Sequence, residues 1–182
     1  MFFADVGTEE PFVARVSLGL LEVLNATFYE KRDEIKSAIW GLTRDCLMPA
    51  FLSLRELRKI AGNPEVPLLT KTKNFDDMCR SLWAAYRDRM KSAARLMGYD
   101  IGFLFDKDSV FEKGCEEFPK TNPLVNVELI GRMKLSRATW QRDLARFRND
   151  YLEHQKLTQE EVAAFYSLPR AEALFERVWV SI

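Results

Sequence analysis

Apolar residues recur at steps of three and four positions along most of the chain, the spacing that places side chains on one face of an α-helix. Thr8 and Pro11 form a helix start, a capping residue followed by a first-turn proline. The helical pattern then continues to about Cys46, as one long helix or as two nearly collinear ones. Pro49 predicts a break or kink. A second helix ends at residues 62–64, where glycine, asparagine and proline occur together.

The middle of the chain is predicted to alternate loops and helices. Residues 63–73 contain two prolines and predict a loop. Asn74 or Asp76 then starts a helix, and Gly98 occupies the position where that helix ends. Residues 99–105 fit either a short strand or a packed loop.

Two more helices are predicted in the second half. A short one covers residues 109–118 and ends ahead of Pro119. Pro123 reopens the helical pattern, and a long helix from about Ser136 carries apolar residues as far as Tyr151.

The C-terminal part contains a recognisable helix start. Thr158 and Glu161 have the spacing of a capping box, so a new helix begins there and the preceding helix ends near residues 154–157. Pro169 starts the last helix.

These elements predict an all-α fold, a bundle of about five to seven helices. The length suits a single helical domain over residues 1–182. Within it, residues 1–62 form long N-terminal helices that either belong to the bundle or extend from it. Residues 74–182 are expected to form the core.

The composition predicts a cytoplasmic protein that does not enter a membrane. Hydrophobic residues make up 47% and charged residues 30%, as is ordinary for folded soluble domains. No apolar run approaches the length of about 20 residues that spans a bilayer, and the first residues lack the basic region of a signal peptide. The three cysteines are odd in number and widely spaced, which favours buried thiols in a reducing compartment.

Charge is balanced overall but uneven along the chain. There are 27 basic and 27 acidic residues, so net charge does not indicate nucleic acid. However, basic residues outnumber acids strongly between Arg80 and Arg95 and again between Arg132 and Arg148. Each run fits a solvated helix face or a surface that faces phosphate groups.

The chemically most specific segment runs from Arg148 to His154, the only histidine in the chain. On a regular helix Arg148 and His154 flank a narrow apolar stripe on opposite sides, about 120° apart and about 9 Å along the axis. One chain therefore cannot easily close both side chains on one phosphate. If the stripe packs across a two-fold axis, the arginine of one copy approaches the histidine of the other. The stripe consists of Trp140, Leu144, Phe147 and Tyr151.

This segment resembles the signature of HEPN domains, in which an arginine is followed directly by a polar residue, and four to six residues separate the arginine from a histidine. Arg148, Asn149 and His154 match these three positions, with five residues between Arg148 and His154. The resemblance implies a small all-α homodimer with the motif at its interface. Many members are metal-independent endoribonucleases of toxin or defence type, and others bind nucleotides or proteins without catalysis. An antitoxin-like partner is expected on the same ground.

The enzyme hypothesis gives each motif residue a role in RNA cleavage. His154 acts as general acid or base, and Asp150, four residues before it, orients the imidazole. Arg148 binds the phosphate with its planar fork of donors, and Asn149 contacts the substrate or the arginine. The flanking residues expected to attract RNA are Arg142 and Arg146.

Simpler interpretations remain open for these residues. Arg148 can serve as a packed stem or an ion-pair partner, and Asp150 can pair with Arg146 on the helix surface. The whole chain can be a HEPN-like dimer that only binds a nucleotide or protein, or a plain helical adaptor. Neither a metal nor another cofactor is expected, because the chain has a single histidine and no Glu-x-x-His pair.

Overall fold

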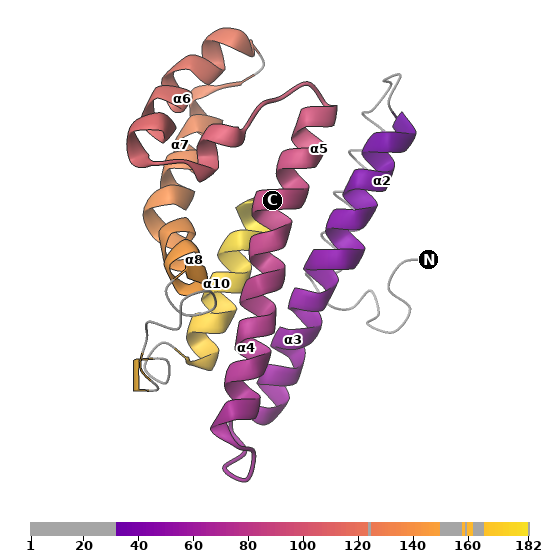
Figure 1. Ribbon diagram of the computed structural model, residues 1–182, viewed down its shortest axis with the longest axis vertical. Helices are drawn as coiled ribbons and strands as arrows, with labels where there is room; N and C mark the ends of the chain where they lie inside the picture. The colour runs from indigo at the N-terminus through magenta and orange to yellow at the C-terminus, as the bar shows by residue number, and fades with distance from the viewer. Residues whose placement is uncertain (1–31, 124, 150–157, 159, 162–165, 182) are drawn as a thin grey trace.

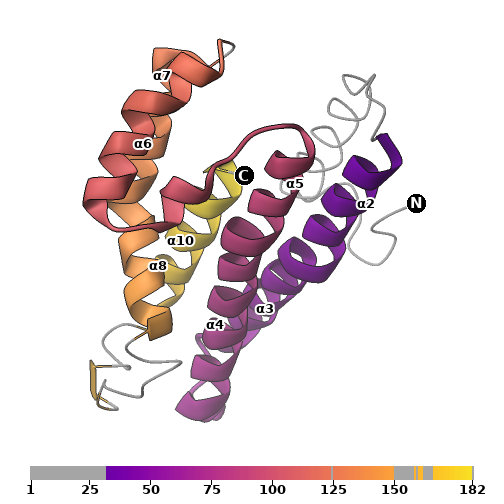
Figure 2. The same ribbon diagram turned by 45° about the horizontal axis from the view of Figure 1, so that its top comes forward.

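Regular structure is entirely helical in the part of the chain that the structure describes (Figure 1). The computed structural model describes residues 32–123, 125–149, 158, 160–161 and 166–181. Two long antiparallel helical segments lie side by side, and the remaining helices pack along one side of this pair (Figure 1 and Figure 2). The predicted all-α bundle is confirmed.

The first long segment stays helical through Pro49. It consists of α2 (Arg32–Leu42), the π-helical turn η1 (Thr43–Leu47) and α3 (Met48–Ile60). The break predicted at Pro49 is wrong, because Leu47 and Met48 both keep helical dihedral angles. In η1 the amide of Met48 donates to the carbonyl of Thr43, five residues earlier. This wider turn lies where a proline ring would crowd the carbonyl four residues before it.

The second long segment begins earlier than the sequence pattern predicts. It consists of α4 (Leu68–Trp83), the π-helical turn η2 (Ala84–Arg89) and α5 (Met90–Leu96). The loop predicted over residues 63–73 is wrong in its second half, and neither Asn74 nor Asp76 caps the helix. Pro67 instead precedes the first turn in an extended conformation, and its carbonyl accepts from the amide of Thr70 at 3.0 Å.

A contact between the two long segments fixes this early start. The ammonium group of Lys71 donates to the carbonyls of Ala61 at 3.0 Å and Asn63 at 2.8 Å. These carbonyls follow the end of α3 and have no partner within the helix. These two hydrogen bonds hold the first turn of α4 beside the end of α3.

The second segment ends at Gly98, as predicted. Gly98 has a φ of 88°, in the left-handed region that glycine adopts without steric cost. The amide of Tyr99 donates to the carbonyl of Ala94, and that of Gly98 to the carbonyl of Arg95, the pattern of a Schellman cap. Residues 99–105 then form a packed loop with a short 3-10 helix, η3 (Gly102–Phe105), rather than a strand.

The helix α6 (Asp108–Thr121) continues past Pro119. The predicted end ahead of Pro119 is wrong, because a proline in the last turn removes a single amide donor. The side chains of Thr121 and Asn122 donate to the carbonyl of Phe118 at 3.2 and 2.9 Å. These bonds satisfy an acceptor that a helix end otherwise leaves open.

The next long helix carries part of the motif and also begins earlier than predicted. It consists of α7 (Val127–Ser136), the π-helical turn η4 (Arg137–Gln141), α8 (Arg142–Arg146) and a further π-helical turn over residues 147–149. The helical pattern reopens just after Pro123, as predicted, but the separate start predicted near Ser136 is wrong, because the helix capped by Asn126 continues through that residue. The side chain of Asn126 accepts from the amide of Leu129 at 2.9 Å.

The capping box predicted at Thr158 is confirmed. The amide of Glu161 donates to the Thr158 hydroxyl at 3.2 Å, and the amide of Thr158 donates to the Glu161 carboxylate at 2.8 Å. The last helix, α10 (Leu168–Ser181), contains Pro169 in its first turn, as predicted.

The main core joins both long segments to the motif helix and α10. Phe75 of α4 meets Phe147 edge to face, with ring centroids 5.3 Å apart, and Tyr86 of η2 meets Trp140 at 4.6 Å. Phe51 of α3 is fully buried against Phe175 of α10. The described part of the N-terminal segment is therefore integral to the bundle.

A second, smaller apolar cluster packs η3 and α6 against the end of α5 and against α7. Its members are Ala94, Ile101, Leu104, Phe111, Cys115 and Phe118. All three cysteines are buried and unpaired, and burial raises the pKa of each thiol. None of the helices described is both long and apolar enough to cross a bilayer.

Two glycines on neighbouring helices provide a matched test of this packing. A Cβ atom on Gly114 of α6 would lie 2.2 Å from Cγ of Phe103, whereas one on Gly131 of α7 would meet nothing within 4 Å. We expect Gly114→Ala to lower the free energy of unfolding by about 1–3 kcal/mol through overpacking. Gly131→Ala should raise it by about 0.5–1 kcal/mol through helix propensity. Urea denaturation measures both, and equal effects would contradict the close approach.

Candidate functional site

Arg148 lies in the π-helical turn that ends the described part of the motif helix. Its side chain is half-buried, and its guanidinium carbon Cζ lies 5.6 Å from the ring centroid of Trp83 on α4. A guanidinium in this position is attracted by the negative face of the indole, a contribution of about 0.5–1 kcal/mol when it is partly exposed. The guanidinium is therefore held at the junction of α4 and the motif helix.

A second guanidinium shares the same aromatic ring. Cζ of Arg87, on η2, lies 5.9 Å from the Trp83 centroid. Arg87 is exposed, and no carboxylate in the described ranges forms an ion pair with it. Two positive charges thus lie within about 12 Å of each other around one indole.

The indole of Trp83 also has an unsatisfied donor. Its Nε1–H is covered from solvent and makes no hydrogen bond. A covered donor without an acceptor costs about 1–3 kcal/mol, and such groups are rare in folded proteins. Trp83 is only partly buried against the main core, whereas Trp140 and Trp179 are buried in it.

Of the other motif residues, the structure describes only Asn149. Asn149 follows Arg148 and is exposed. Asp150, Tyr151 and His154 lie outside the described residues. The expected support of His154 by Asp150 stays a prediction.

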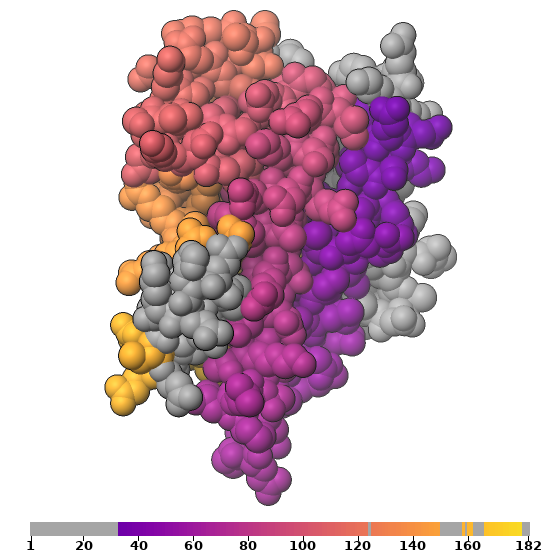
Figure 3. All heavy atoms as spheres, viewed as in Figure 1, coloured from indigo at the N-terminus to yellow at the C-terminus, as the bar shows by residue number. Residues whose placement is uncertain are grey.

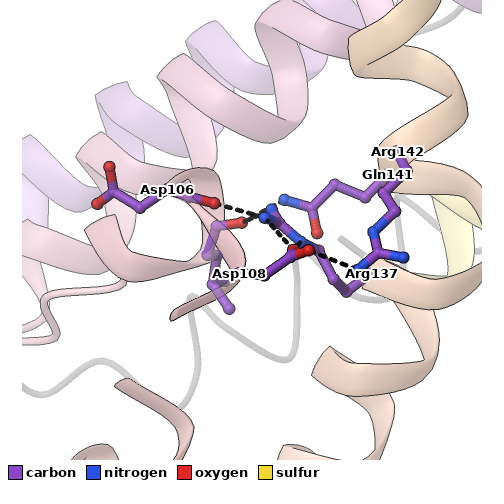
Figure 4. A network of polar contacts seen from close by, with 6 residues as sticks. Asp106, Asp108, Arg137, Gln141 and Arg142 are labelled. Carbon is purple, nitrogen blue, oxygen red and sulfur yellow. Dashed lines mark hydrogen bonds and ion pairs between the residues drawn. The ribbon is translucent and has the colours of Figure 1, made fainter. Parts of the chain in front are cut away.

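Arg142 is part of a polar network that faces α6 rather than Trp83. It donates to the carboxylate of Asp108 at 2.9 Å, and Arg137 donates to the same carboxylate at 3.0 Å (Figure 4). Arg137 also donates to the carbonyls of Leu104 and Asp106. The two arginines lower the pKa of Asp108 by donating hydrogen bonds to its charged form.

The same network holds one buried side chain. Gln141 is only 2% exposed, and its amide donates to the carbonyl of Leu104 (Figure 4). Arg137 covers the ring of Phe111, with Cζ 5.1 Å from the centroid. The network therefore fixes the loop before α6 against the motif helix, which is a structural role.

Arg146 is exposed, and its charge contributes to lowering the pKa of Glu161, after the hydrogen bonds from Thr158. Arg142 pairs with Asp108, whereas Arg148 lies over Trp83. The predicted attraction of RNA by Arg142 and Arg146 stays a prediction.

The apolar stripe beside the motif is not available for a subunit contact in its described part. Trp140, Leu144 and Phe147 are at most 2% exposed and pack in the chain's own core. This geometry rules out pairing two copies through these three side chains, the arrangement from which a composite site was expected.

Two signals in the sequence could have identified Trp83 and Arg87. Arg80, Trp83 and Arg87 follow one another at steps of three and four residues, so they share a helix face. They also lie inside the basic run that begins at Arg80. The approach of Arg148 to this face, by contrast, depends on how the helices pack.

A metal site does not emerge from the part of the chain described: no three His, Cys, Asp or Glu side chains in it converge. Comparison with protein-family models, curated protein sequences and solved structures finds no match to the chain.

The network predicts unequal roles for its two arginines. Arg137 is 14% exposed and its guanidinium group donates to three acceptor residues, whereas Arg142 is 61% exposed and donates only to Asp108. Arg137→Ala should lower the free energy of unfolding by about 2–3 kcal/mol, and Arg142→Ala by less than about 1 kcal/mol. Chemical denaturation compares them, and similar losses would refute the structural role of Arg137.

The lowered pKa of Asp108 gives the network a pH dependence. A carboxylate whose folded pKa lies below its unfolded value stabilises the fold above the unfolded pKa, about 3.9 for Asp, and loses this effect as the pH falls through the folded pKa. Asp108→Asn should therefore lower Tm near neutral pH, and the difference from wild type should shrink in acid. Thermal unfolding scans from neutral to acid pH measure the difference in Tm between Asp108→Asn and the wild type. A difference that does not change with pH would contradict the ion pairing of Asp108.

Proposed function

We propose that the chain is a HEPN-like, metal-independent endoribonuclease in which Arg148 binds the scissile phosphodiester and His154 transfers protons. The observation that carries the proposal is the half-buried guanidinium of Arg148, held over Trp83 beside the second guanidinium of Arg87. A fixed, planar fork of donors is suited to a phosphate and to the extra negative charge of its transition state.

The proposed reaction needs no metal ion. The ribose 2′-oxygen forms a bond to phosphorus while the bond from phosphorus to the 5′-oxygen breaks. The 2′-hydroxyl proton passes to a general base, and the departing 5′-oxygen receives a proton from a general acid. His154 serves as acid or base, a role that imidazole fills near neutral pH. Asp150 orients the imidazole, and Asn149 contacts substrate.

The remaining predicted residues have smaller roles in this proposal. Arg142 and Arg146 attract RNA only at long range, because Arg142 is paired with Asp108 and Arg146 lies near Glu161. A homodimer with a composite site would have to pair through the flank that carries Arg148, since the described part of the stripe is buried. A toxin or defence role, with an antitoxin-like partner, follows only from the HEPN resemblance, and the cytoplasmic location follows from the composition.

The burial of the stripe favours a second candidate. Trp140, Leu144 and Phe147 cannot carry the subunit contact from which the composite site was inferred. A HEPN-like protein that binds a nucleotide or another protein without catalysis needs no such site. Binding of labelled nucleotide without turnover distinguishes it from the nuclease, and a monomer that does neither is a helical adaptor.

Incubation of the purified protein with mixed RNA in EDTA tests the nuclease. We expect wild-type protein to cleave RNA, and Arg148→Ala and His154→Ala each to reduce the rate about a hundredfold or more. Arg148→Lys should also be impaired, because an ammonium group lacks the planar fork. Arg132→Ala is the matched control, since it removes an exposed arginine paired with Glu128 on α7.

The rate is measured from the appearance of fragments on a denaturing gel, with circular dichroism to confirm that each variant is folded. Wild-type protein without activity, or folded Arg148→Ala and His154→Ala proteins with wild-type rates, would remove the nuclease proposal.

A further inference from the structure

The exposed face of α4 and η2 carries a line of three residues, and two of them, Trp83 and Arg87, lie beside Arg148. Arg80, Trp83 and Arg87 are spaced at steps of three and four residues, so that Arg80 and Arg87 lie about one turn on either side of the indole. Arg80 and Arg87 are both exposed. The helix that carries them forms a long stretch of the face seen in Figure 3, with the end of the motif helix against it.

Neither flanking arginine is neutralised by the described part of the chain. No described carboxylate forms an ion pair with Arg80 or Arg87. Most other arginines with described side chains differ in this respect. Arg44, Arg58, Arg89, Arg132, Arg137, Arg142 and Arg170 each have a carboxylate within ion-pair distance. The line therefore presents positive charge outward, beside the guanidinium of Arg148.

We propose that Arg80, Trp83 and Arg87 bind the backbone of single-stranded RNA and lead it to Arg148. This inference rests on the proposed nuclease function and assigns its substrate class. Arg87 and Arg148, both anchored on the Trp83 ring, contact neighbouring phosphates of one strand, and Arg80 contacts a phosphate further along. The indole sets the separation of the two guanidinium groups.

The arrangement fits a single strand better than a duplex. Proteins that bind single strands follow one backbone with a row of basic groups, and here the indole of Trp83 holds two such groups, those of Arg87 and Arg148. Double-stranded RNA is recognised instead across a wide, shallow groove by contacts to two strands, which one row of side chains on one helix cannot make.

The test measures binding separately from cleavage. Fluorescence anisotropy with a labelled single-stranded RNA of mixed sequence, and with a duplex of the same length, is recorded for His154→Ala protein. Arg80→Ala and Arg87→Ala, each added to this background, should weaken single-strand binding about fivefold to tenfold and reduce the salt dependence by about one phosphate contact. Arg132→Ala in the same background, with the same loss of charge, should change binding less than twofold.

Each outcome decides the proposal. Weaker binding in both line variants, little change in the control and poorer binding of the duplex support it. Unchanged binding in the line variants, an equal loss in the Arg132→Ala control, equal binding of the duplex, or equal competition by polyglutamate would overturn it.

The nuclease proposal is decided independently by RNA cleavage in the wild type. Loss of binding in the line variants alongside an inactive wild type would retain the single-strand surface and remove the nuclease. An active wild type whose Arg80→Ala and Arg87→Ala variants bind and cleave RNA normally would retain the nuclease and remove the single-strand surface.

Discussion

The aromatic contacts between the motif helix and the second long segment determine where Arg142 and Arg148 lie. Phe147 meets Phe75, and Trp140 meets Tyr86, both edge to face. Each such pair contributes about 0.5–1.5 kcal/mol beyond the burial of its apolar area. Because these contacts fix the rotation of the motif helix about its axis, the flank bearing Arg148 is directed at Trp83, and Trp140, Leu144 and Phe147 are enclosed in the core.

The polar network around Arg137 divides the basic residues of the motif helix between structure and surface. Arg137 and Arg142 share the carboxylate of Asp108 at the start of α6, and Arg137 also holds the loop that precedes it. The basic residues that follow one another closely in the sequence of the motif helix therefore lie on different sides of it. At the junction with α4, two helices each bring a guanidinium group to the Trp83 ring, through Arg148 and Arg87.

Two neighbouring arginines of η2 serve opposite sides of their helix. Arg87 lies over Trp83, while Arg89 approaches Asp45 of η1 at 3.7 Å. Residues two positions apart point in nearly opposite directions from a helix, because each residue turns it by about 100°. One short segment can thus serve the contact between the two long helices on one side and the basic surface on the other.

The sequence by itself determined the all-α fold, the end at Gly98, the capping box at Thr158 and the spacing that joins Arg80, Trp83 and Arg87, because these depend on contacts within a few residues. The pattern of residues predicted the wrong starts for α4 and for the helix that contains α7, and it predicted interruptions at Pro49 and Pro119 that do not occur. At the start of α4, the side chain of Lys71 donates hydrogen bonds to the end of another helix. A helix accommodates Pro49 by a wider turn, and side-chain caps satisfy the helix end that follows Pro119. Only the tertiary structure decided that Arg148 packs on Trp83 while Arg142 pairs with Asp108. Those choices follow from how buried aromatic faces interlock, and helical periodicity does not specify which other helix a given face will meet.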